Sequence, residues 1–448
     1  MSDRRQIVVV DGVKSDVCQV KAGVPQGSRL GPLLFILYIN DIQTNLESDI
    51  LIYADDTTLL AVGKNPTDTS NMLNRDLTKI NIWAETWKVT FQAEKSRDIL
   101  LSEKTFLNHP QLTLNTEHIK QVTQHKHLGL ILTSNLDWTP QVHAVCLKAN
   151  RKLSVLRQAK YLQRQTLDLL YKITVRAVTD YGLPIFYHTL KLTDKNRLEQ
   201  LQYKAAKLVT GALHLTSKDK LNAELGWETI AARADTLGLS IFYKTLIGEN
   251  RPLIRQCMPA FAPITIHNTR HKAQFTPFPL GKLKFKNSFF PYFTQKFESL
   301  PDNVKKQPDI IQFKMAVKGF FCPKRYKFLS KGNKIENTLL TRIRVGRSYL
   351  HSHSFTIGLS DTPACHCTAH TESPQHFFLH CPLYTEERRT LLDTCEQYIP
   401  KFKSFPKERQ FNIILHGFDP DNHELNHINS SLQYAAQRFV QQTKRFSH

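Results

Sequence analysis

Two adjacent aspartates, Asp55 and Asp56, lie between two segments rich in Ile, Leu, Val and Thr. This composition predicts a tight β-hairpin that carries both acids at or beside its turn. Two carboxylates on one turn either face open water or hold a hard cation, and their oxygens suit Mg²⁺ poised to bind substrate phosphates. Taken alone, an Asp-Asp turn is ordinary, and the solvated turn remains the alternative.

A second group of residues suits a softer metal. Cys365, Cys367, His376 and Cys381 follow the pattern C-x-C-x8-H-x4-C. Three thiolates and one imidazole suit tetrahedral Zn²⁺, and four protein ligands would close its shell, so the site would be structural. The C-x-C spacing is tighter than the usual C-x2-C, which leaves incidental thiols as the alternative. Three other histidines could substitute for a ligand: His366, His370 and His380.

The elements that must position the aspartates come before and after them. Arg5–Val13 and Val17–Val20 predict two strands joined by an Asp-Gly turn. The loop Gly23–Pro32 contains three Gly and two Pro and leads into Leu33–Ile42, which predicts a buried helix behind a ligand-facing loop. After the hairpin, Asp68–Val89 predicts a helix whose core residues fall at helical spacing: Met72, Leu73, Leu77, Ile80 and Trp83.

Two more strands, Asp98–Ser102 and His125–Leu132, complete a small α+β unit that ends near Ser134. From Trp138 to about Glu249 the pattern is helical, with Thr193 or Asp194 as a plausible N-cap. Two buried faces are expected there: Leu170, Ile173, Ala177, Val178 and Tyr181 on one, and Leu198, Leu201, Ala205, Leu208 and Val209 on the other.

The residue composition changes at two positions in the C-terminal half of the chain. Residues 250–335 are Pro-rich, aromatic and basic, and residues 282–296 predict either a nucleic-acid surface or a solvated linker with core phenylalanines. Residues 336–448 predict a helix over Leu339–Tyr349, the Cys/His cluster, and a closing amphipathic helix over Leu432–Arg445.

The overall charge points to a polyanionic partner. The 448 residues include 60 Lys and Arg against 39 Asp and Glu, a formal charge of +21, which favours nucleic acid. We find neither a basic amphipathic helix nor a lipid anchor for a membrane surface, and no apolar run reaches the roughly 18 residues of a membrane span. Asp11 interrupts the signal-like stretch Ile7–Val13, and scattered single cysteines suit a reducing compartment, so we expect a soluble intracellular protein.

The segment Gly23–Phe35 (GVPQGSRLGPLLF), followed by Tyr53-Ala54-Asp55-Asp56, resembles the reverse transcriptases of non-LTR (LINE-type) retrotransposons, in particular jockey-like elements. Later segments carry the resemblance along nearly the whole chain: Trp87–Ser96, His127–Gly129, Leu170–Lys172, Tyr181–Pro184, Lys204–Lys207, Glu224–Trp227, Phe285–Pro291 and the Cys/His cluster.

The resemblance implies an α+β fold with an incomplete polymerase palm. Residues 1–134 would be the partial palm, and residues 135–249 a helical thumb holding the template–primer duplex. Residues 250–335 would be a basic aromatic connector, and residues 336–448 a C-terminal region with a zinc knuckle. The implied partners are RNA and DNA, including the element's own transcript, and the implied location is nuclear or nucleocytoplasmic.

The resemblance also implies roles for single residues. Asp55 would bind the catalytic Mg²⁺ ions, Asp56 would support or share that site, and Tyr53 and Ala54 would position the turn. The loop residues Pro25, Gln26 and Gly27 would face the template base and the incoming nucleotide. Gln26 alternatively caps the following helix through its amide.

Two further roles are implied by the same comparison. Lys95 would protonate the leaving pyrophosphate, although a lone lysine in a turn is usually solvated. The strand containing His127–Gly129 would grip the primer. Gln92-Ala93 stands where relatives often have Asn-Pro, which weakens the assignment of Lys95.

The sequence differs from the family pattern mainly near its N-terminus. The fingers and the first palm aspartate, a ligand of both metals, precede the glycine-rich loop in the family. Here 22 residues precede that loop, and none of Asp3, Asp11 or Asp16 has the strand context of that ligand. We therefore expect a fragment that binds nucleic acid without synthesis. The alternatives are an active polymerase when the upstream part is supplied, and a domesticated nucleic-acid-binding protein.

Overall fold

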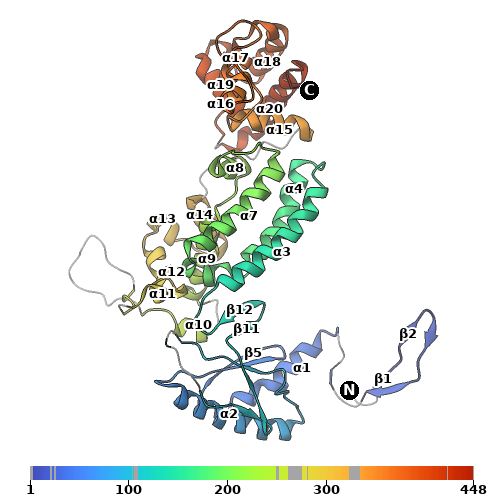
Figure 1. Ribbon diagram of the computed structural model, residues 1–448, viewed down its shortest axis with the longest axis vertical. Coiled ribbons are helices and arrows are strands. Elements are labelled where there is room, and N and C mark those ends of the chain that lie inside the picture. The colour runs from blue at the N-terminus through green and yellow to red at the C-terminus, as the bar shows by residue number, and fades with distance from the viewer. Residues whose placement is uncertain are drawn as a thin grey trace. The chain divides into compact units, whose positions relative to one another are not determined.

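The computed structural model describes residues 4–20, 23–24, 27–102, 104, 109–248, 252–260, 275–279, 281–321, 333–420 and 422–446. The chain divides into two compact units, residues 1–137 and 138–448 (Figure 1). The first unit combines strands with helices and the second is helical, which confirms the α+β class. The predicted divisions near residues 249 and 335 fall inside the second unit and stay predictions.

The first unit begins with a β-ribbon in two short ladders. β1 (Arg4–Gln6) pairs with β4 (Cys18–Val20), and β2 (Val9–Val10) pairs with β3 (Val13–Lys14), both antiparallel. Asp11 and Gly12 both have positive φ, as the tight turn requires. The predicted strands and turn are confirmed, but the valines of the ribbon are exposed, at 53–74% for Val8, Val9, Val10, Val13 and Val17.

The helix after the glycine-rich loop, α1, covers Leu30–Ile39 and continues as a 3₁₀ turn, Asn40–Gln43. Of its residues only Gly31 and Ile39 are buried, so the prediction of a buried helix is wrong. The sequence is apolar on every side, which predicts burial, but the neighbouring helix α2 covers one side alone.

The predicted acidic hairpin is confirmed. β5 (Asp49–Tyr53) and β6 (Asp56–Leu60) pair antiparallel in the register Tyr53 to Asp56. The long helix α2 (Pro66–Trp87) follows, close to the predicted range; Asn65 caps its N-terminus by accepting from the Asp68 N–H at 2.8 Å. Ile50 and Ile52 of β5 pack with Ile80 of α2 in one core cluster.

A buried carboxylate fixes the entry to β5. Asp76 of α2 is fully buried and accepts hydrogen bonds from the backbone N–H groups of Glu47 and Ser48 at 2.7–3.0 Å. It also accepts from the Ser48 hydroxyl and from Lys79. Burial opposes the charge, but these bonds outweigh it and lower the pKa of Asp76. This contact anchors the hairpin to α2.

Short strands complete the first unit. β7 (Arg97–Asp98) pairs parallel with β10 (Lys120–Gln121), and β8 (Thr113–Leu114) pairs antiparallel with β9 (Glu117–His118). Of the predicted strand Asp98–Ser102, only Asp98 lies in a strand, β7, so most of that prediction is wrong. The predicted single strand His125–Leu132 is wrong: Leu128 and Gly129 have positive φ and form a turn. They separate two paired strands, β11 (Gln124–His127) and β12 (Leu130–Thr133).

The second unit begins with a bundle of helices, as predicted. Its first core cluster joins α3, α4, α7 and α8 around Tyr171, Trp227 and ten further buried residues. The elements are α3 (Thr139–Gln158), α4 (Arg164–Leu170), a π-helix (Tyr171–Arg176), α5 (Ala177–Asp180), α6 (Leu183–Phe186), a 3₁₀ turn (Tyr187–Thr189), α7 (Leu192–Thr210), α8 (Lys218–Leu225) and α9 (Ile230–Leu246).

One predicted face of this bundle is wrong. Ile173 and Tyr181 are 59% and 56% exposed, whereas Leu167, Tyr171, Val175 and Thr179, each four residues apart, are buried. The π-helix takes more residues per turn than the α-helix on which the prediction depended, so it rotates the buried face. The second predicted face, on α7, is confirmed.

The predicted N-cap of α7 is also wrong. The helix begins at Leu192 after Lys191, and Asp194 lies inside its first turn. Asp194 is buried there and accepts a hydrogen bond from the Thr139 hydroxyl at 2.7 Å. Its carboxylate therefore ties α7 to the start of α3.

Residues 275–321 pack onto α9 as part of the same unit. Phe293, Phe297 and Phe313 are buried against Leu239 and Phe242. A Cβ at Gly238 would come within 1.9 Å of the Phe293 ring, so only glycine permits this approach. The aromatic residues are therefore core. The elements are α10 (Pro252–Gln256), α11 (Leu283–Lys286), α12 (Phe289–Glu298), α13 (Asp302–Lys305) and α14 (Ile310–Phe321).

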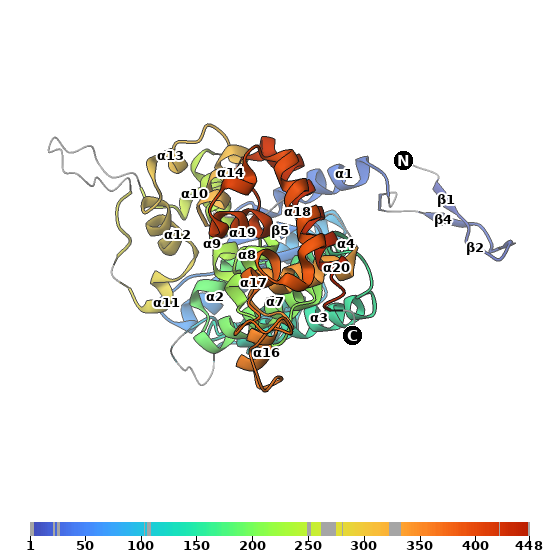
Figure 2. The ribbon, with the colours of Figure 1, turned by 90° about the horizontal axis from the view of Figure 1, so that it is seen from above.

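The last helices, drawn in orange and red, lie together (Figure 2). They enclose the largest core cluster of the described residues, built around Phe377, Phe378 and Phe439. The predicted helix Leu339–Tyr349 begins earlier, behind an Asn333–Glu336 capping box, and ends earlier; the predicted closing helix also begins earlier. The elements are α15 (Lys334–Arg344), α16 (His351–Thr356), α17 (Pro374–Leu379), α18 (Thr385–Tyr398), α19 (Lys407–His416), α20 (Asn426–Gln442), and 3₁₀ turns at Pro382–Tyr384, Phe402–Ser404 and His423–Leu425.

A buried ion cluster joins α15 to the bundle. Glu224 of α8 lies 2.8 Å from the Arg164 guanidinium of α4 and 2.5 Å from that of Arg344 of α15. The Thr341 hydroxyl also donates to it. Burial alone would raise the pKa of Glu224, but the charges and hydrogen bonds of both arginines outweigh it and hold the pKa at about 2.

Candidate functional site

The acidic turn consists of two residues between paired strands. Tyr53 pairs with Asp56, which leaves Ala54 and Asp55 as the turn. Ala54 has a positive φ of 52°, a conformation that costs a non-glycine residue about 1 kcal/mol or more. Tyr53, Ala54, Asp55 and Asp56 are all exposed. The hairpin therefore presents both carboxylates to solvent, where a cation and its phosphate ligands could reach them.

The hairpin β11–β12 supplies basic neighbours to this turn. Burial lowers the pKa of His125, the charges of His127 and Arg97 lower it further, and the charge of Asp56 opposes them. Asp56 therefore lies within electrostatic reach of His125. No third acidic side chain joins Asp55 and Asp56 in a metal-sized group among the residues that the structure describes.

The sequence also predicted Pro25, Gln26, Gly27 and Lys95 as residues of this site. Pro25 and Gln26 lie outside the described residues. Gly27 has a φ of +77°, and nothing lies within 4 Å of where its Cβ would be. Lys95 is exposed in the turn after α2, and within the described ranges no hydrogen bond or ion pair joins it to Asp55 or Asp56. Its predicted role stays a prediction.

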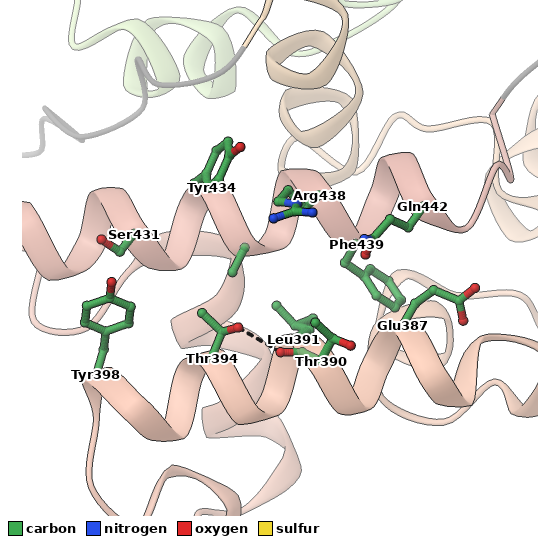
Figure 3. Close-up of a pocket in the computed structure, with 11 residues that line it drawn as sticks. Glu387, Thr390, Leu391, Thr394, Tyr398, Ser431, Tyr434, Arg438, Phe439 and Gln442 are labelled. Atoms are coloured by element: carbon green, nitrogen blue, oxygen red, sulfur yellow. Dashed lines mark hydrogen bonds between the residues drawn. The ribbon is translucent and has the colours of Figure 1, made fainter.

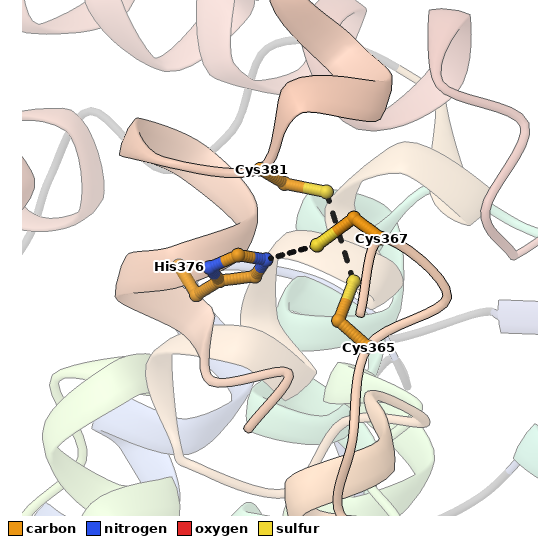
Figure 4. Close-up of side chains that lie close together, drawn as sticks. All are labelled: Cys365, Cys367, His376 and Cys381. Atoms are coloured by element: carbon orange, nitrogen blue, oxygen red, sulfur yellow. Dashed lines mark hydrogen bonds between the residues drawn. The ribbon is translucent and has the colours of Figure 1, made fainter. Parts of the chain in front are cut away.

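The four predicted ligands of the softer metal lie together. One donor atom from each of Cys365, Cys367, His376 and Cys381 falls within 4.8 Å of the others. The sulfurs of Cys365 and Cys381 are 3.7 Å apart, and the sulfur of Cys367 is 3.2 Å from His376 Nε2 (Figure 4). A tetrahedral metal with sulfur ligands at about 2.3 Å has sulfur–sulfur edges of about 3.8 Å. The donor set therefore fits a tetrahedral ion.

The backbone around these ligands is fixed by local hydrogen bonds. The Cys365 N–H donates to Ala369 O, and the Cys381 N–H donates to His376 O. Ser373 caps α17 by accepting from the His376 N–H at 3.1 Å. The Arg388 guanidinium donates to Cys381 O. The four ligands are thus held in place by the protein's own contacts.

Burial of the cluster affects its thiols. Cys381 is fully buried and Cys365 is 5% exposed, and burial raises the pKa of Cys381 to about 12 and that of Cys365 in the same direction. Without a metal these thiols would keep their protons, so binding an ion must release them. Four ligands from the chain leave no open position for a substrate.

A basic helix without acidic residues was not recognised from the sequence. α3 has four Lys and Arg residues and no Asp or Glu. Lys148, Arg151 and Arg157 are exposed, and no ion pair involves them among the residues that the structure describes. On neighbouring helices, by contrast, cations are paired: Lys172 with Asp168, Arg197 with Asp194, and Arg233 with Asp180. Counting acids helix by helix would have revealed this helix.

A groove of about 550 Å³ lies between α18 and α20 (Figure 3). Leu391, Ala435 and Phe439 form its apolar floor, and Tyr434 and Arg438 line one side. Its lining mixes hydroxyls with one acid and one base, a chemistry that selects no class of ligand.

The first unit matches a known family. The family described as reverse transcriptase (RNA-dependent DNA polymerase) matches residues 4–132. This range contains the acidic turn, its supporting helix α2 and the hairpin β11–β12. The matched part of the chain is therefore similar to reverse transcriptases.

Similar proteins narrow the class. The RNA-directed DNA polymerase from mobile element jockey of Drosophila melanogaster is 30% identical over 226 residues, 47% of this chain and 24% of that relative. The Retrovirus-related Pol polyprotein from type-1 retrotransposable element R1 of Bradysia coprophila is 24% identical over 433 residues, 90% of this chain and 39% of that relative. The chain is thus similar to polymerases of non-LTR retrotransposons, and it spans well under half of the length of these relatives.

The described helices include none with the length and apolar character needed to cross a bilayer.

Proposed function

We propose that this chain is part of an RNA-directed DNA polymerase that binds a template–primer duplex of RNA and DNA. The acid-free helix α3 supports the binding function, with cations on more than one side of its exposed surface. Lys148, Arg151 and Arg157 lie on an exposed helix within ten residues, about 14 Å along its axis. Unpaired cations at this spacing suit consecutive phosphates of a nucleic-acid backbone.

The acidic turn supports the polymerase part of the proposal. Asp55 and Asp56 would hold Mg²⁺, which when bound neutralises triphosphate charge and activates the primer 3′ hydroxyl. Tyr53 and Ala54 set the direction of the turn, and Gln26 and Lys95 would act on template and pyrophosphate. Two exposed carboxylates make a weak Mg²⁺ site, since such sites normally use further ligands. We therefore expect this chain alone to bind duplex without extending a primer.

A binding assay tests helix α3 directly. The full chain is titrated with a 15-base-pair RNA–DNA hybrid at several salt concentrations, without Mg²⁺. Replacing Lys148, Arg151 and Arg157 with Ala should weaken binding and reduce the slope of log K against log salt by about 0.7–0.9 for each lost phosphate contact. The matched control is Lys172→Ala, which removes an exposed cation that pairs with Asp168.

Two outcomes would contradict the proposal. An unchanged salt slope in the α3 variant would show that this helix does not bind the backbone. Incorporation of nucleotides by the purified chain on a primed poly(A) template with Mg²⁺ would show that Asp55 and Asp56 need no further carboxylate.

Zinc is the metal that we propose for the Cys/His cluster. Three sulfurs and one imidazole nitrogen are the donor set that Zn²⁺ accepts in closed structural sites. There it would hold the segment before α17 against the start of α18. Its role would be to stabilise the C-terminal core.

The remaining parts of the proposal concern where the chain acts. The element's own transcript is the template that we propose, and the nucleus is where genomic DNA would serve as target. The structure gives less support to a separate binding module over residues 250–448, because α9, which ends at Leu246, supplies part of the core under residues 275–321.

A further inference from the structure

Glu372 lies between the metal ligands in the sequence and is almost completely buried. Its side chain is 1% exposed, and it is not one of the four ligands. Both of its oxygens accept hydrogen bonds at 2.7 Å from the guanidinium of Arg445, in a bidentate pair. One of them also accepts from the His351 N–H, at the start of α16, at 2.7 Å. Glu372 therefore joins α16 to the residues that follow α20.

The backbone of Glu372 closes the ligand loop, which we define as residues 363–372. The Glu372 N–H donates to Pro363 O at 2.8 Å, and inside the loop the Cys365 N–H donates to Ala369 O at 2.9 Å. This loop carries the first two metal ligands. Because the side chain of Glu372 is paired with Arg445, charge-assisted hydrogen bonds hold that arginine beside the ligand loop.

A second arginine contacts the segment that carries the last ligand. Arg388 of α18 donates from Nε to Phe378 O at 3.0 Å, and its Nη2 donates to Cys381 O. The next residue, Arg389, has a side chain that is 68% exposed and pairs with Glu386. One of these neighbouring arginines thus contacts the ligand segment, whereas the other lies at the surface.

Both arginines lie close enough to the ligand sulfurs for their charges to interact. Burial lowers the pKa of Arg388, and the charge of Cys381 opposes this change. The hydrogen bonds to Glu372 raise the pKa of Arg445, burial opposes them, and the charges of Glu372 and Cys365 are among those that raise it further. Each arginine is therefore within electrostatic reach of one buried ligand sulfur.

The charge of the site changes when a metal binds. Cysteine binds a metal as a thiolate, so a divalent ion with these three thiolates and a neutral imidazole carries one net negative charge. Glu372 adds a second negative charge, and Arg388 and Arg445 together balance the two. A buried charge is costly unless it is paired. The arginines therefore stabilise the metal-bound site more than the metal-free site.

We propose that Arg388 and Arg445 balance the charge of the metal–thiolate centre, and that Glu372 is a positioning residue that holds Arg445 beside it. These three residues do not bind the metal, and their effect is to favour its retention. The inference rests on the zinc site of the proposed function, since the charge to be balanced exists only when a divalent ion is bound.

The zinc affinity of the full chain tests this role. It is measured by competition with a chromophoric chelator. Arg388→Gln and Arg445→Gln should each weaken affinity by about 10–100-fold, the usual effect of losing a group that supports a metal ligand. Glu372→Gln should act as Arg445→Gln does. The matched controls are Arg389→Gln and Lys444→Gln, which remove an exposed cation beside each arginine and should leave affinity within about twofold.

Two further measurements separate charge balance from a merely structural role. Arg445→Lys keeps the positive charge but cannot form the bidentate pair, so it should retain more zinc affinity than Arg445→Gln. The thermal unfolding midpoint of Arg388→Gln, compared with that of the native chain, should fall more when zinc is bound than when a chelator has removed it. A structural role alone would lower both midpoints equally.

Three results would each overturn the proposal. They are zinc affinities of the Arg388 and Arg445 variants equal to those of the controls, an equal fall of the two midpoints, and an Arg445→Lys variant as weak as Arg445→Gln. If the native chain binds zinc and one of these results is found, the zinc site stands and only the charge balance fails. If the native chain binds no zinc, both proposals fail.

Discussion

The two candidate metal sites of this chain differ in nearly every physical respect. The Asp55–Asp56 turn offers two hard oxygen ligands, both exposed, from one two-residue turn. The Cys/His cluster offers four soft ligands over seventeen residues, with Cys381 fully buried beside the largest core cluster of the described residues. One site is open and incomplete, whereas the other is closed and complete.

This difference follows from what each kind of site must do. A structural ion can be bound by ligands from one short segment, because closing the shell is its whole purpose. A catalytic ion needs room for substrate and ligands from distant segments. The chain therefore contains the full set of four ligands for the candidate structural site, while its acidic turn is positioned by Asp76 and α2 and left exposed.

The largest effect is expected when the closed site loses a ligand. Cys381→Ser should abolish stoichiometric zinc binding and destabilise the C-terminal core by several kcal/mol, because metal binding contributes directly to folding of such sites. Metal content by plasma mass spectrometry and the thermal unfolding midpoint check this. A strong chelator should lower the midpoint of the native chain in the same way.

Cys395→Ser separates loss of the metal from loss of a buried thiol. Cys395 is also fully buried but does not belong to the cluster. This variant should keep its zinc while losing some stability. Native zinc content in Cys381→Ser would contradict the assignment.

A smaller loss is expected at the buried ion cluster. Glu224→Gln leaves Arg164 and Arg344, whose side chains are 9% and 2% exposed, without their counter-charge. Breaking such a pair costs about 3–5 kcal/mol. Urea unfolding at neutral pH measures this. Glu386→Gln on exposed α18, which pairs with Arg389, should change the free energy of unfolding by less than about 1 kcal/mol.

The same carboxylate predicts a pH dependence. The pKa of Glu224 is about 2 in the folded chain, below its ordinary value of 4.5. A depressed folded pKa adds stability that is fully present above pH 4.5 and is lost as the pH falls from 4.5 toward 2. The native chain should lose this contribution over that range. A similar acid-dependent loss in Glu224→Gln would contradict the assignment to this residue.

Local patterns predicted the local elements. The Ile, Leu, Val and Thr composition on both sides of Asp55 predicted the hairpin. Apolar residues at helical spacing predicted α2, because that period is a property of the helical backbone. The Cys/His ligands could be predicted for the same reason, since they lie close in sequence and their residue types are selective.

Features that depend on distant contacts could not be predicted. Glu224 meets Arg164 and Arg344 across 60 and 120 residues, and no local pattern encodes this meeting. The apolar sequence of α1 predicts burial wherever a partner exists, but cannot identify the partner. The π-helix at Tyr171–Arg176 has a different number of residues per turn, and the prediction of the buried helix face depended on that number.

The smallest effect on stability is expected at the open site. Asp55→Asn should change the free energy of unfolding by no more than about 0.5 kcal/mol, because the side chain is exposed and has no partner among the described residues. The same change should weaken binding of Mn²⁺, a paramagnetic substitute for Mg²⁺, at the turn. Magnetic relaxation of nearby protons and chemical unfolding measure the two effects. Asp68→Asn removes a comparably exposed acid from the start of α2 and should leave Mn²⁺ binding intact. Strong destabilisation by Asp55→Asn, with unchanged metal binding, would mean that the turn is structural and that the contrast between the two sites is wrong.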